Sequence, residues 1–225
     1  MQGHKRAINL VAESLALANL ILSYKPLITP STFLLDLKGQ PARPMAPDEL
    51  AAARHCGIDD ARIQSAFDAF QGVARRMEVR GEARGVAVVD DFGHHPTAIR
   101  ETLKALRIKY PTQKLWAVFE PRSNTTRRNV FQTDLVDALE RADVIVVAEV
   151  ARLEQLRPEE RLNPEKLMQD LRRTGKPAAY LPTVDAIVDH LATQTRPGDV
   201  VCCFSNGGFG GIHARVLSRL GEGRK

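Results

Sequence analysis

The sequence predicts an α/β fold with a doubly wound, mostly parallel sheet of the Rossmann-like type. Apolar runs rich in β-branched residues alternate with segments of helical period, and these runs lie at 86–90, 115–119, 144–148, 178–181 and 200–204. The run 144–148 is apolar throughout, as expected for a strand whose two faces are both covered. Alternating units of this length favour helices on both sides of one parallel sheet.

The first of these units is expected to be a strand at 86–90 followed by a helix at 96–108. A proline at the first position of this helix is favourable, because the N–H that proline lacks is not needed there. Apolar side chains three and four positions apart share one helix face. The residues on this face are Ile99, Leu103 and Leu106.

The later units follow the same alternation, and turn residues separate them. Gly175 suits a helix end, because glycine accepts left-handed backbone. The expected elements are a strand at 115–119, a helix at 131–141, a strand at 144–148, a helix from Asn163 and Pro164 to Gly175, a strand at 178–181, a helix at 184–192, a strand at 200–204 and a helix at 212–220.

The residues before the sheet are expected to form a smaller helical part. Residues 1–49 combine an apolar stretch of broadly helical spacing with scattered prolines, and they receive no assignment beyond a possible strand at 32–37. A hairpin-like connection at 82–85 marks the expected boundary. The predicted organisation is an unassigned segment at 1–49, two short helices (50–55 and 60–70) and a linker within 50–82, and an α/β domain at 83–225.

Composition and charge narrow the classes of partner. The chain has 225 residues, of which 44% are hydrophobic and 26% charged, as in ordinary globular proteins. Its net charge of +5 and pI near 9.3 suit an anionic partner such as a nucleotide or a UDP-sugar. Nucleic acid is disfavoured, because the arginine pairs are dispersed, only three Tyr and one Trp are available for stacking, and no nucleic-acid-binding motif is present.

The sequence also indicates a compartment. No apolar run approaches the length of a membrane span, so no membrane association is expected. The cysteines are Cys56, Cys202 and Cys203, an odd number with two of them adjacent in an expected buried strand. This pattern does not indicate a disulfide framework, and we expect a cytoplasmic protein.

Chemistry is expected where the first strand of the sheet ends. Residues 90–97 read DDFGHHPT, and open α/β sheets bind ligands at the carboxyl ends of their strands. Asp90 and Asp91 end a buried strand, so at least one carboxylate should turn toward a ligand hydroxyl, a metal or a helix-start amide. Gly93 permits a tight loop between strand and helix.

Two simpler interpretations of this stretch stay open. Asp91 could merely cap the helix, with both histidines solvated, because Asp is a preferred capping residue. A two-histidine metal site fits less well, because adjacent side chains in a turn usually point apart and no HxxxH or CxxC companion is present.

Two further motifs follow later strands. Residues 120–125 read EPRSNT, and residues 205–213 read SNGGFGGIH. The glycines of the second motif do not have the GxGxxG spacing and follow the last strand, so a dinucleotide-dependent dehydrogenase is disfavoured. These glycines could serve only as a flexible turn between strand and helix.

Together these motifs resemble the Mur ligase family, the ATP-dependent enzymes that add amino acids or peptides to the UDP-muramoyl precursor of peptidoglycan. Residues 72–77, GVARRM, are similar to the G-x-x-R-R-F stretch of the family, with Met77 in place of Phe. Within the family the three motifs resemble most the ligases that join the murein tripeptide L-Ala-γ-D-Glu-meso-diaminopimelate to UDP-N-acetylmuramate in peptidoglycan recycling. Ligation of L-alanine to UDP-N-acetylmuramate, the MurC type, is disfavoured by residues 120–125 and 205–213. The resemblance extends from about residue 50 to the C-terminus.

The resemblance implies ATP and Mg²⁺ as cofactors, with UDP-N-acetylmuramate and the murein tripeptide as substrates. ATP would activate a carboxylate of the UDP-muramoyl substrate as an acyl phosphate, which an amine then attacks. By motif position Asp91 would hydrogen-bond the ribose, and Arg76 and His94 would lie beside the nucleotide. The alternative for Arg75 and Arg76 is a solvated pair at the edge of a linker.

The resemblance also implies that the C-terminal domain provides most of the site for the incoming peptide. Arg122 follows the strand 115–119 and offers a bidentate guanidinium to a peptide carboxylate. The alternative is an exposed arginine at a loop start. The candidate peptide-binding residues are Arg122, Asn124, Ser205, Asn206, Gly207 and Gly208.

A phosphate-binding loop of the form G-x-x-x-x-G-K-[ST] is missing from the 225 residues. The chain is therefore expected to lack the N-terminal UDP-sugar-binding domain and most of the central domain of a ligase, with 50–82 a remnant of the latter. No catalytic residue is assigned, and turnover by the chain alone is not expected. A non-catalytic module that binds peptide or nucleotide remains the alternative.

Overall fold

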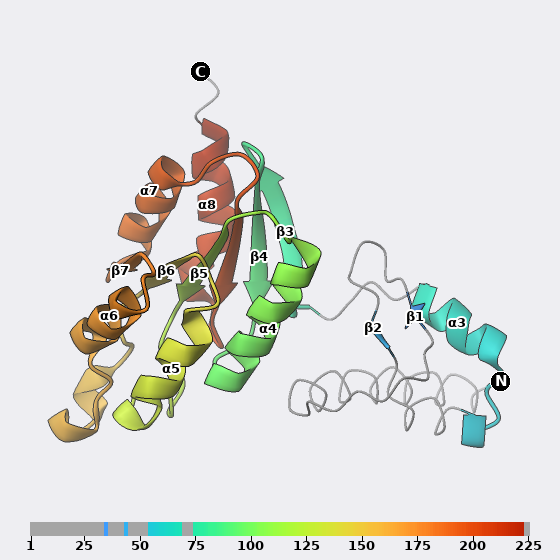
Figure 1. Cartoon of the computed structure of the whole chain (residues 1–225), viewed down its shortest axis with the longest axis horizontal. Helices are drawn as coiled ribbons and strands as arrows, with labels where there is room; N and C mark the ends of the chain where they lie inside the picture. Colours follow the sequence, from blue (N-terminus) through green and yellow to red (C-terminus); the bar gives the residue numbers. More distant parts are fainter. Residues whose placement is uncertain (1–33, 36–42, 45–53, 69–73, 223–225) are drawn as a thin grey trace. The chain divides into compact units, whose positions relative to one another are not determined.

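The computed structural model describes residues 34–35, 43–44, 54–68 and 74–222. The chain forms two compact units, Met1–Val73 and Ala74–Lys225 (Figure 1). In the first unit, β1 (Leu34–Leu35) pairs antiparallel with β2 (Arg43–Pro44), and α3 spans Asp60–Asp68. The rest of the predicted strand 32–37, most of the predicted helix 50–55 and the end of the predicted helix 60–70 lie outside the described residues.

The second unit alternates strands and helices as the sequence predicts. Two of its strands, β5 and β8, have the predicted bounds, β3 was not predicted, and the other elements differ from prediction by one to a few residues. The elements are β3 (Glu78–Ala83), β4 (Val86–Asp91), α4 (Pro96–Lys109), β5 (Leu115–Phe119), α5 (Gln132–Leu139), β6 (Val144–Val147), α6 (Pro164–Arg173), β7 (Ala178–Tyr180), α7 (Val184–Gln194), β8 (Val200–Phe204) and α8 (Ile212–Gly221).

These strands form one six-stranded sheet in the order β3-β4-β8-β5-β6-β7. All neighbouring pairs are parallel except β3 and β4, which form an antiparallel hairpin at one edge. Arg84 and Gly85 form its turn with φ of 52° and 71°, a pair of left-handed residues typical of tight hairpins. The predicted doubly wound, mostly parallel α/β fold is confirmed.

The β3–β4 hairpin places the start of the second unit earlier in the sequence than the predicted domain boundary. By contacts the second unit already begins at Ala74, because β3 is part of its sheet. The family-domain boundary between residues 82 and 83 stays a prediction.

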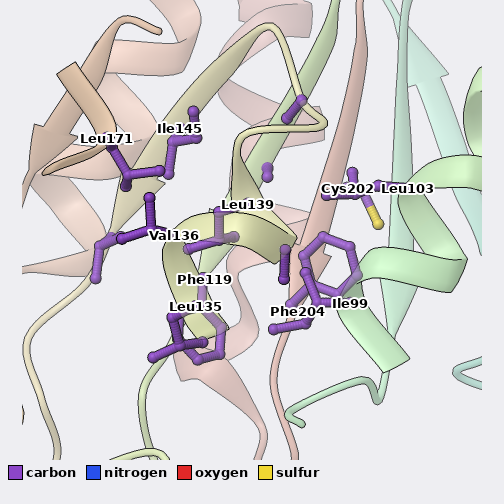
Figure 2. Close-up of a cluster of buried hydrophobic side chains, with 14 of the residues drawn as sticks. Ile99, Leu103, Phe119, Leu135, Val136, Leu139, Ile145, Leu171, Cys202 and Phe204 are labelled. Carbon is purple, nitrogen blue, oxygen red and sulfur yellow. The ribbon is translucent and has the colours of Figure 1, made fainter. Parts of the chain in front are cut away.

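Helices cover both faces of the sheet (Figure 1). One hydrophobic core lies between the sheet and α4, α5 and α6, and the other lies between the sheet and α7 and α8. Figure 2 shows the first core, in which Phe119 and Phe204 from neighbouring strands meet Ile99 of α4 and Leu135 of α5. Strand residues alternate between the cores, so Cys202 faces one and Cys203 the other. Both cysteines are free and buried, and burial raises the pKa of both thiols.

The strand register aligns the carboxyl ends of the central strands. Asp91 pairs with Phe204, Phe204 pairs with Phe119, and Phe119 pairs with Val147. The residues that follow β4, β8 and β5 therefore emerge along one edge of the sheet, where ligand sites of such folds lie. No helix in the described part of the chain is long and apolar enough to cross a membrane.

Candidate functional site

The candidate site begins at the ends of β4, β8 and β5, which backbone hydrogen bonds hold together. The Ser205 N–H donates to the carbonyl of Asp91 at 3.1 Å, and the Glu120 N–H donates to the carbonyl of Phe204 at 3.0 Å. The motifs 90–97, 120–125 and 205–213 therefore start side by side. We call residues 90–94 the acidic loop and residues 205–211 the glycine loop.

Asp91 lies inside the acidic loop with only 2% of its surface exposed. Its Oδ1 accepts from the Gly93 N–H at 2.7 Å and its Oδ2 from the Met77 N–H at 2.9 Å. Burial raises the pKa of this carboxyl, and the two N–H donors partly oppose the shift. The carboxylate thus stabilises the loop, and its predicted contact with a ribose stays a prediction.

The interpretation of Asp91 as the helix cap is wrong. The residue that caps α4 is His95, whose Nδ1 accepts from the Thr97 N–H at 3.3 Å, with Pro96 in the first turn. Asp91 is too far from the helix start, because three loop residues separate it from the cap. His95 also packs edge-on against Phe131 with ring centroids 4.7 Å apart, and burial lowers its pKa.

Asp90 points to the opposite side of the sheet, toward α8, because neighbouring strand residues alternate. Only 4% of its surface is exposed, and its Oδ2 accepts from Nε of Arg75 at 3.3 Å. Its Oδ1 lies 3.4 Å from Nε2 of His213, without the geometry of a hydrogen bond. The expectation that one of the two carboxylates turns outward is therefore wrong: alternation sends them to opposite cores, and flanking segments cover both.

His213 lies near the start of α8, and its ring is nearly buried. Burial lowers its pKa, the Asp90 carboxylate opposes this shift, and Arg80 and Arg75 add to it. The charge of Glu78, like that of Asp90, raises the pKa of His213. Burial therefore favours the neutral form of this imidazole.

Phe92 brings the two arginines of the GVARRM stretch to the acidic loop. Its ring lies under the guanidinium groups of both Arg75 and Arg76, each 5.2 Å from the ring centroid. The His94 ring meets Phe92 edge-on at 5.4 Å, and its Nδ1 lies 3.1 Å from the Phe92 carbonyl oxygen. Of the three residues predicted to approach the nucleotide, Asp91 and His94 therefore belong to the acidic loop and Arg76 packs against it.

The two arginines differ in their partners. Arg75 is half-buried and forms an ion pair with Asp90, so the solvated-pair interpretation is wrong for this residue. Arg76 makes no hydrogen bond with any residue in the described ranges, and its charge acts on the nearby Asp91 carboxyl. Its guanidinium is thus available to an anion.

Arg122 lies against the glycine loop, as the shared edge of the sheet predicts. A Cβ atom on Gly207 would be 2.6 Å from Nε and 2.7 Å from Cδ of Arg122. Nη1 of Arg122 lies 3.6 Å from Oε1 of Glu120, and the Ser205 hydroxyl donates to Oε2 of the same carboxylate. The Gly207 N–H in turn donates to Oγ of Ser205 at 2.9 Å. The structure thus brings Arg122, Ser205 and Gly207 together around Glu120.

Asn124 belongs to a turn after β5 that a buried arginine supports. Its Oδ1 accepts from Nη2 of Arg127 at 2.9 Å. Nη1 of Arg127 donates to the Arg152 carbonyl at 3.0 Å and to Oε1 of Gln155 at 3.2 Å. The amide oxygen of Asn124 is therefore occupied, and its NH₂ group makes no hydrogen bond among the described residues.

The other candidates in the glycine loop make fewer contacts. Oδ1 of Asn206 is buried and has no hydrogen-bond partner in the described residues. Nothing lies within 4 Å of a Cβ added to Gly208. Phe209 has φ of 43° although it is not glycine, and its buried ring anchors the loop in the core beneath α8. Such backbone conformations recur at functional sites.

Several residues of this arrangement carry no assignment from the sequence: Arg75, Asp90, Glu120, Arg127 and His213. All of them except Arg127 stand within the recognised motifs, so motif membership was a usable signal for these four residues. The burial of Arg127 had no such signal, because an arginine pair normally indicates solvated surface. Within the described residues, no group of three or more His, Cys, Asp or Glu side chains could hold a metal ion.

Comparison with known proteins identifies the family of this arrangement. The family model for the Mur ligase glutamate ligase domain matches residues 75–207, which include both arginines, the acidic loop and the start of the glycine loop. The chain belongs to the Mur ligase family. The UDP-N-acetylmuramate–L-alanyl-γ-D-glutamyl-meso-2,6-diaminoheptandioate ligase of Escherichia coli K12 is 40% identical over 174 residues, which are 77% of this chain and 36% of that protein.

Other Mur ligases agree with this assignment. The murein peptide ligase of Psychrobacter arcticus superposes with a TM-score of 0.59 and 35% identity, over 77% of this chain and 35% of that one. A domain of a putative ligase of the same type from Haemophilus ducreyi superposes with a TM-score of 0.51 and 34% identity, over 64% of this chain and 99% of that one. A UDP-N-acetylmuramate–L-alanine ligase of Geobacter sulfurreducens is 33% identical over 78% of this chain and 38% of its own length. The chain thus spans a little over a third of the curated relatives it matches.

Proposed function

We propose that this chain is the C-terminal part of an ATP-dependent ligase that joins the murein tripeptide L-Ala-γ-D-Glu-meso-diaminopimelate to UDP-N-acetylmuramate. The observation that carries this proposal is the packing of Arg122 against Gly207, which unites the motifs 120–125 and 205–213 at one edge of the sheet. The relative with 40% identity bears the name of a ligase for this tripeptide. Peptidoglycan recycling in the cytoplasm is part of the proposal.

The peptide is assigned to the surface formed by Arg122, Asn124 and residues 205–208. The tripeptide carries several carboxylates, and a guanidinium binds a carboxylate through two parallel hydrogen bonds. Asn124 offers its NH₂ group, since Arg127 occupies the amide oxygen. The hydrogen bond between Ser205 and Glu120 fixes the end of β5 to the glycine loop. The backbone from which the Arg122 side chain extends is therefore ordered.

The nucleotide is assigned to the acidic loop. Arg76 suits a phosphate, because its guanidinium has no hydrogen-bond partner among the described residues, and the His94 ring stands beside it on Phe92. Asp91 is 2% exposed, so a bond from its carboxylate to a ribose requires the acidic loop to open. ATP supplies the activating phosphoryl group; the described residues include no set of ligands for Mg²⁺.

Two alternatives have specific support. L-alanine ligases occur among the relatives, and one is 33% identical over 177 residues. A module that binds without catalysis is compatible with the missing phosphate loop, because phosphoryl transfer without that cradle loses its main electrostatic stabilisation.

Calorimetric titration of the purified chain with the murein tripeptide, and separately with L-alanine, tests the proposal. The expected result is saturable binding of the tripeptide and none of L-alanine at the same concentration. Preference for L-alanine would favour the MurC type, and binding of neither would contradict the peptide assignment. A parallel assay should detect no ATP-dependent joining of tripeptide to UDP-N-acetylmuramate by the chain alone; measurable joining would refute the need for the missing phosphate loop.

A further inference from the structure

Arg75 touches both loops of the candidate site, and its side chain holds two residues of the proposed peptide surface, Ser205 and Gly207, by their carbonyl groups. Its Nη2 donates to the carbonyls of Ser205 and Gly207, each at 2.7 Å. Its Nε donates to Asp90 at 3.3 Å. One planar guanidinium thus joins the end of β4 to the glycine loop, although 130 residues of sequence separate Arg75 from Ser205.

The carbonyl contacts define the shape of the glycine loop. The oxygens of Ser205 and Gly207 converge on a single nitrogen, which requires the chain between them to turn back on itself. Inside this turn the Gly207 N–H donates to Oγ of Ser205. Two carbonyl oxygens so close together repel each other unless a cation lies between them. The positive charge of Arg75 removes this repulsion.

The backbone of Arg75 is fixed to the acidic loop at the same time. Its carbonyl accepts from the Phe92 N–H, and its own N–H donates to Oε2 of Glu78, both at 2.8 Å. Arg75 has φ of 59° and Met77 has φ of 48°, in the left-handed region that side chains normally avoid. The Met77 N–H bonds the Asp91 carboxylate. These hydrogen bonds hold the unfavourable conformation in place.

We infer that Arg75 is a positioning residue that sets the conformation of the glycine loop, and thereby the position of Gly207 beneath Arg122. The effect on peptide binding rests on the proposed function; the effect on the loop does not. Arg75 differs in this from Arg76, whose guanidinium makes no hydrogen bond within the described part of the chain. An ammonium cannot replace Arg75, because only a guanidinium can reach a carboxylate and two carbonyls through nitrogens in one plane.

The test compares Arg75→Gln and Arg75→Lys with a matched control, Arg80→Gln. Arg80 lies on β3 and pairs with the same Glu78, but it makes no hydrogen bond with either loop in the described residues. Amide hydrogen exchange, measured by NMR on the ligand-free chain, reports the opening of residues 205–207 directly. The amides of β5 and β8, such as that of Cys202, report global opening in the same experiment.

Arg75→Gln is expected to speed exchange at Ser205 and Gly207 about tenfold or more, because hydrogen bonds to a charged donor are among the stronger ones. Arg75→Lys should give a smaller rise, and Arg80→Gln none. Exchange within β5 and β8 should stay at the wild-type rate. A rise spread equally over the sheet would show a merely structural role, and an unchanged loop would overturn the inference.

Titration with the murein tripeptide completes the test. Arg75→Gln should weaken tripeptide binding about tenfold, with partial recovery in Arg75→Lys and unchanged affinity in Arg80→Gln. A freed loop with unchanged tripeptide affinity would refute the positioning role while leaving the proposed function intact. If the wild-type chain binds no tripeptide, the proposed function fails, and the exchange data alone decide whether Arg75 sets the loop.

Discussion

The guanidinium of Arg122 lies so close to Gly207 that a methyl group on this glycine would be 2.6 Å from Nε. Real Cβ atoms do not approach a neighbouring atom so closely, so Arg122 occupies the space that any other residue at 207 would fill. The contact joins β5 to the loop after β8. A larger residue at this position, whose φ lies outside the left-handed region, would therefore displace the Arg122 side chain.

Gly207→Ala should weaken tripeptide binding about tenfold while the fold is retained. The added methyl group would push the Arg122 side chain away from its position, and a displaced arginine loses its paired hydrogen bonds to a carboxylate. The backbone at 207 accepts alanine, so the thermal midpoint should change little. Calorimetric titration with the tripeptide provides the measurement.

Gly208→Ala is the matched control. Nothing lies within 4 Å of a Cβ at Gly208, and its φ of −80° suits alanine. Unchanged affinity is expected. Equal losses in the two variants would indicate that the loop needs flexibility, and the contact with Arg122 would then not be the cause.

Much of this fold could be predicted from local sequence. The strands Leu115–Phe119 and Val200–Phe204 match prediction because unbroken apolar runs end at polar residues or turns. The strand Glu78–Ala83 was not predicted, since it is a largely exposed edge strand with the polar sequence EVRGEA. Its pairing depends on β4 and on the hairpin turn, and not on its own composition.

The candidate site was predictable only in part. Asp91, Arg122 and Gly207 could be predicted to lie at one edge of the sheet, because each lies at or after the carboxyl end of a strand. The three strands are parallel, so their carboxyl ends are aligned. The role of Arg75 could not be predicted, since its partners at 205 and 207 are distant in sequence and its left-handed backbone leaves no mark on composition.

Arg122→Lys should raise the dissociation constant of the tripeptide about tenfold. Lysine keeps the charge but loses the planar fork that binds a carboxylate through two bonds. Binding of a non-hydrolysable ATP analogue to the complete ligase should remain nearly unchanged. Arg157→Lys, a change in an exposed arginine paired with Glu159 and Glu160, serves as control; if it lowers affinity as much, Arg122 has no special role.

Asp91→Asn should destabilise the second unit by about 1–2 kcal/mol, the usual cost of an unmade buried hydrogen bond. The carboxylate accepts from two N–H groups, of Met77 and Gly93. Asparagine has one acceptor oxygen and would direct its NH₂ group at the other donor. Removal of the buried charge offsets part of the loss. Urea unfolding at pH 7, with the exposed Asp137→Asn as control, measures the difference; equal stability would contradict the role of Asp91 in the loop.

Asp143 should make the stability of the chain sensitive to acid. Burial opposes ionisation of this carboxyl, but the Leu115 N–H and the Arg107 guanidinium outweigh burial and hold its pKa below the ordinary 3.8. A lowered pKa gives stability that is full above the unfolded value and lost as pH falls through the folded value. Asp143 and Arg107 are both partly exposed, so the contribution is at most about 1 kcal/mol.

The corresponding experiment compares the wild type with Asp143→Asn in urea at pH 7 and at pH 3. The variant should be less stable at pH 7, and the gap should narrow at pH 3, which lies below the ordinary pKa of the carboxyl in the unfolded chain. Asp137→Asn should show no gap at either pH. A gap that is constant with pH would mean that shape, and not charge, explains the effect.

Asn124→Asp should stabilise the fold and weaken tripeptide binding. Arg127 is 4% exposed and has no carboxylate within ion-pair distance among the described residues. Burial lowers its pKa, as do Arg152 and Arg128, while Glu154 raises it. A carboxylate in place of the Asn124 amide would pair with Nη2 of this guanidinium. The expected gain is about 1 kcal/mol, or some 2–4 °C in Tm for a chain of this size.

The same substitution removes the NH₂ donor and adds a negative charge where the peptide carboxylate is assigned, so tripeptide affinity should fall at least about tenfold. Gln155→Glu is the matched control. Oε1 of Gln155 accepts from Nη1 of Arg127 at 3.2 Å, whereas Asn124 accepts from Nη2 of the same guanidinium. Gln155→Glu should raise Tm similarly and leave tripeptide binding unchanged. If both variants are stabilised and bind the tripeptide with equal affinity, Asn124 does not belong to the peptide site. If only Asn124→Asp loses tripeptide affinity, the Asn124 NH₂ group donates to the peptide. The buried charge of Arg127 then stays without a carboxylate partner in the native chain because an amide is needed at position 124.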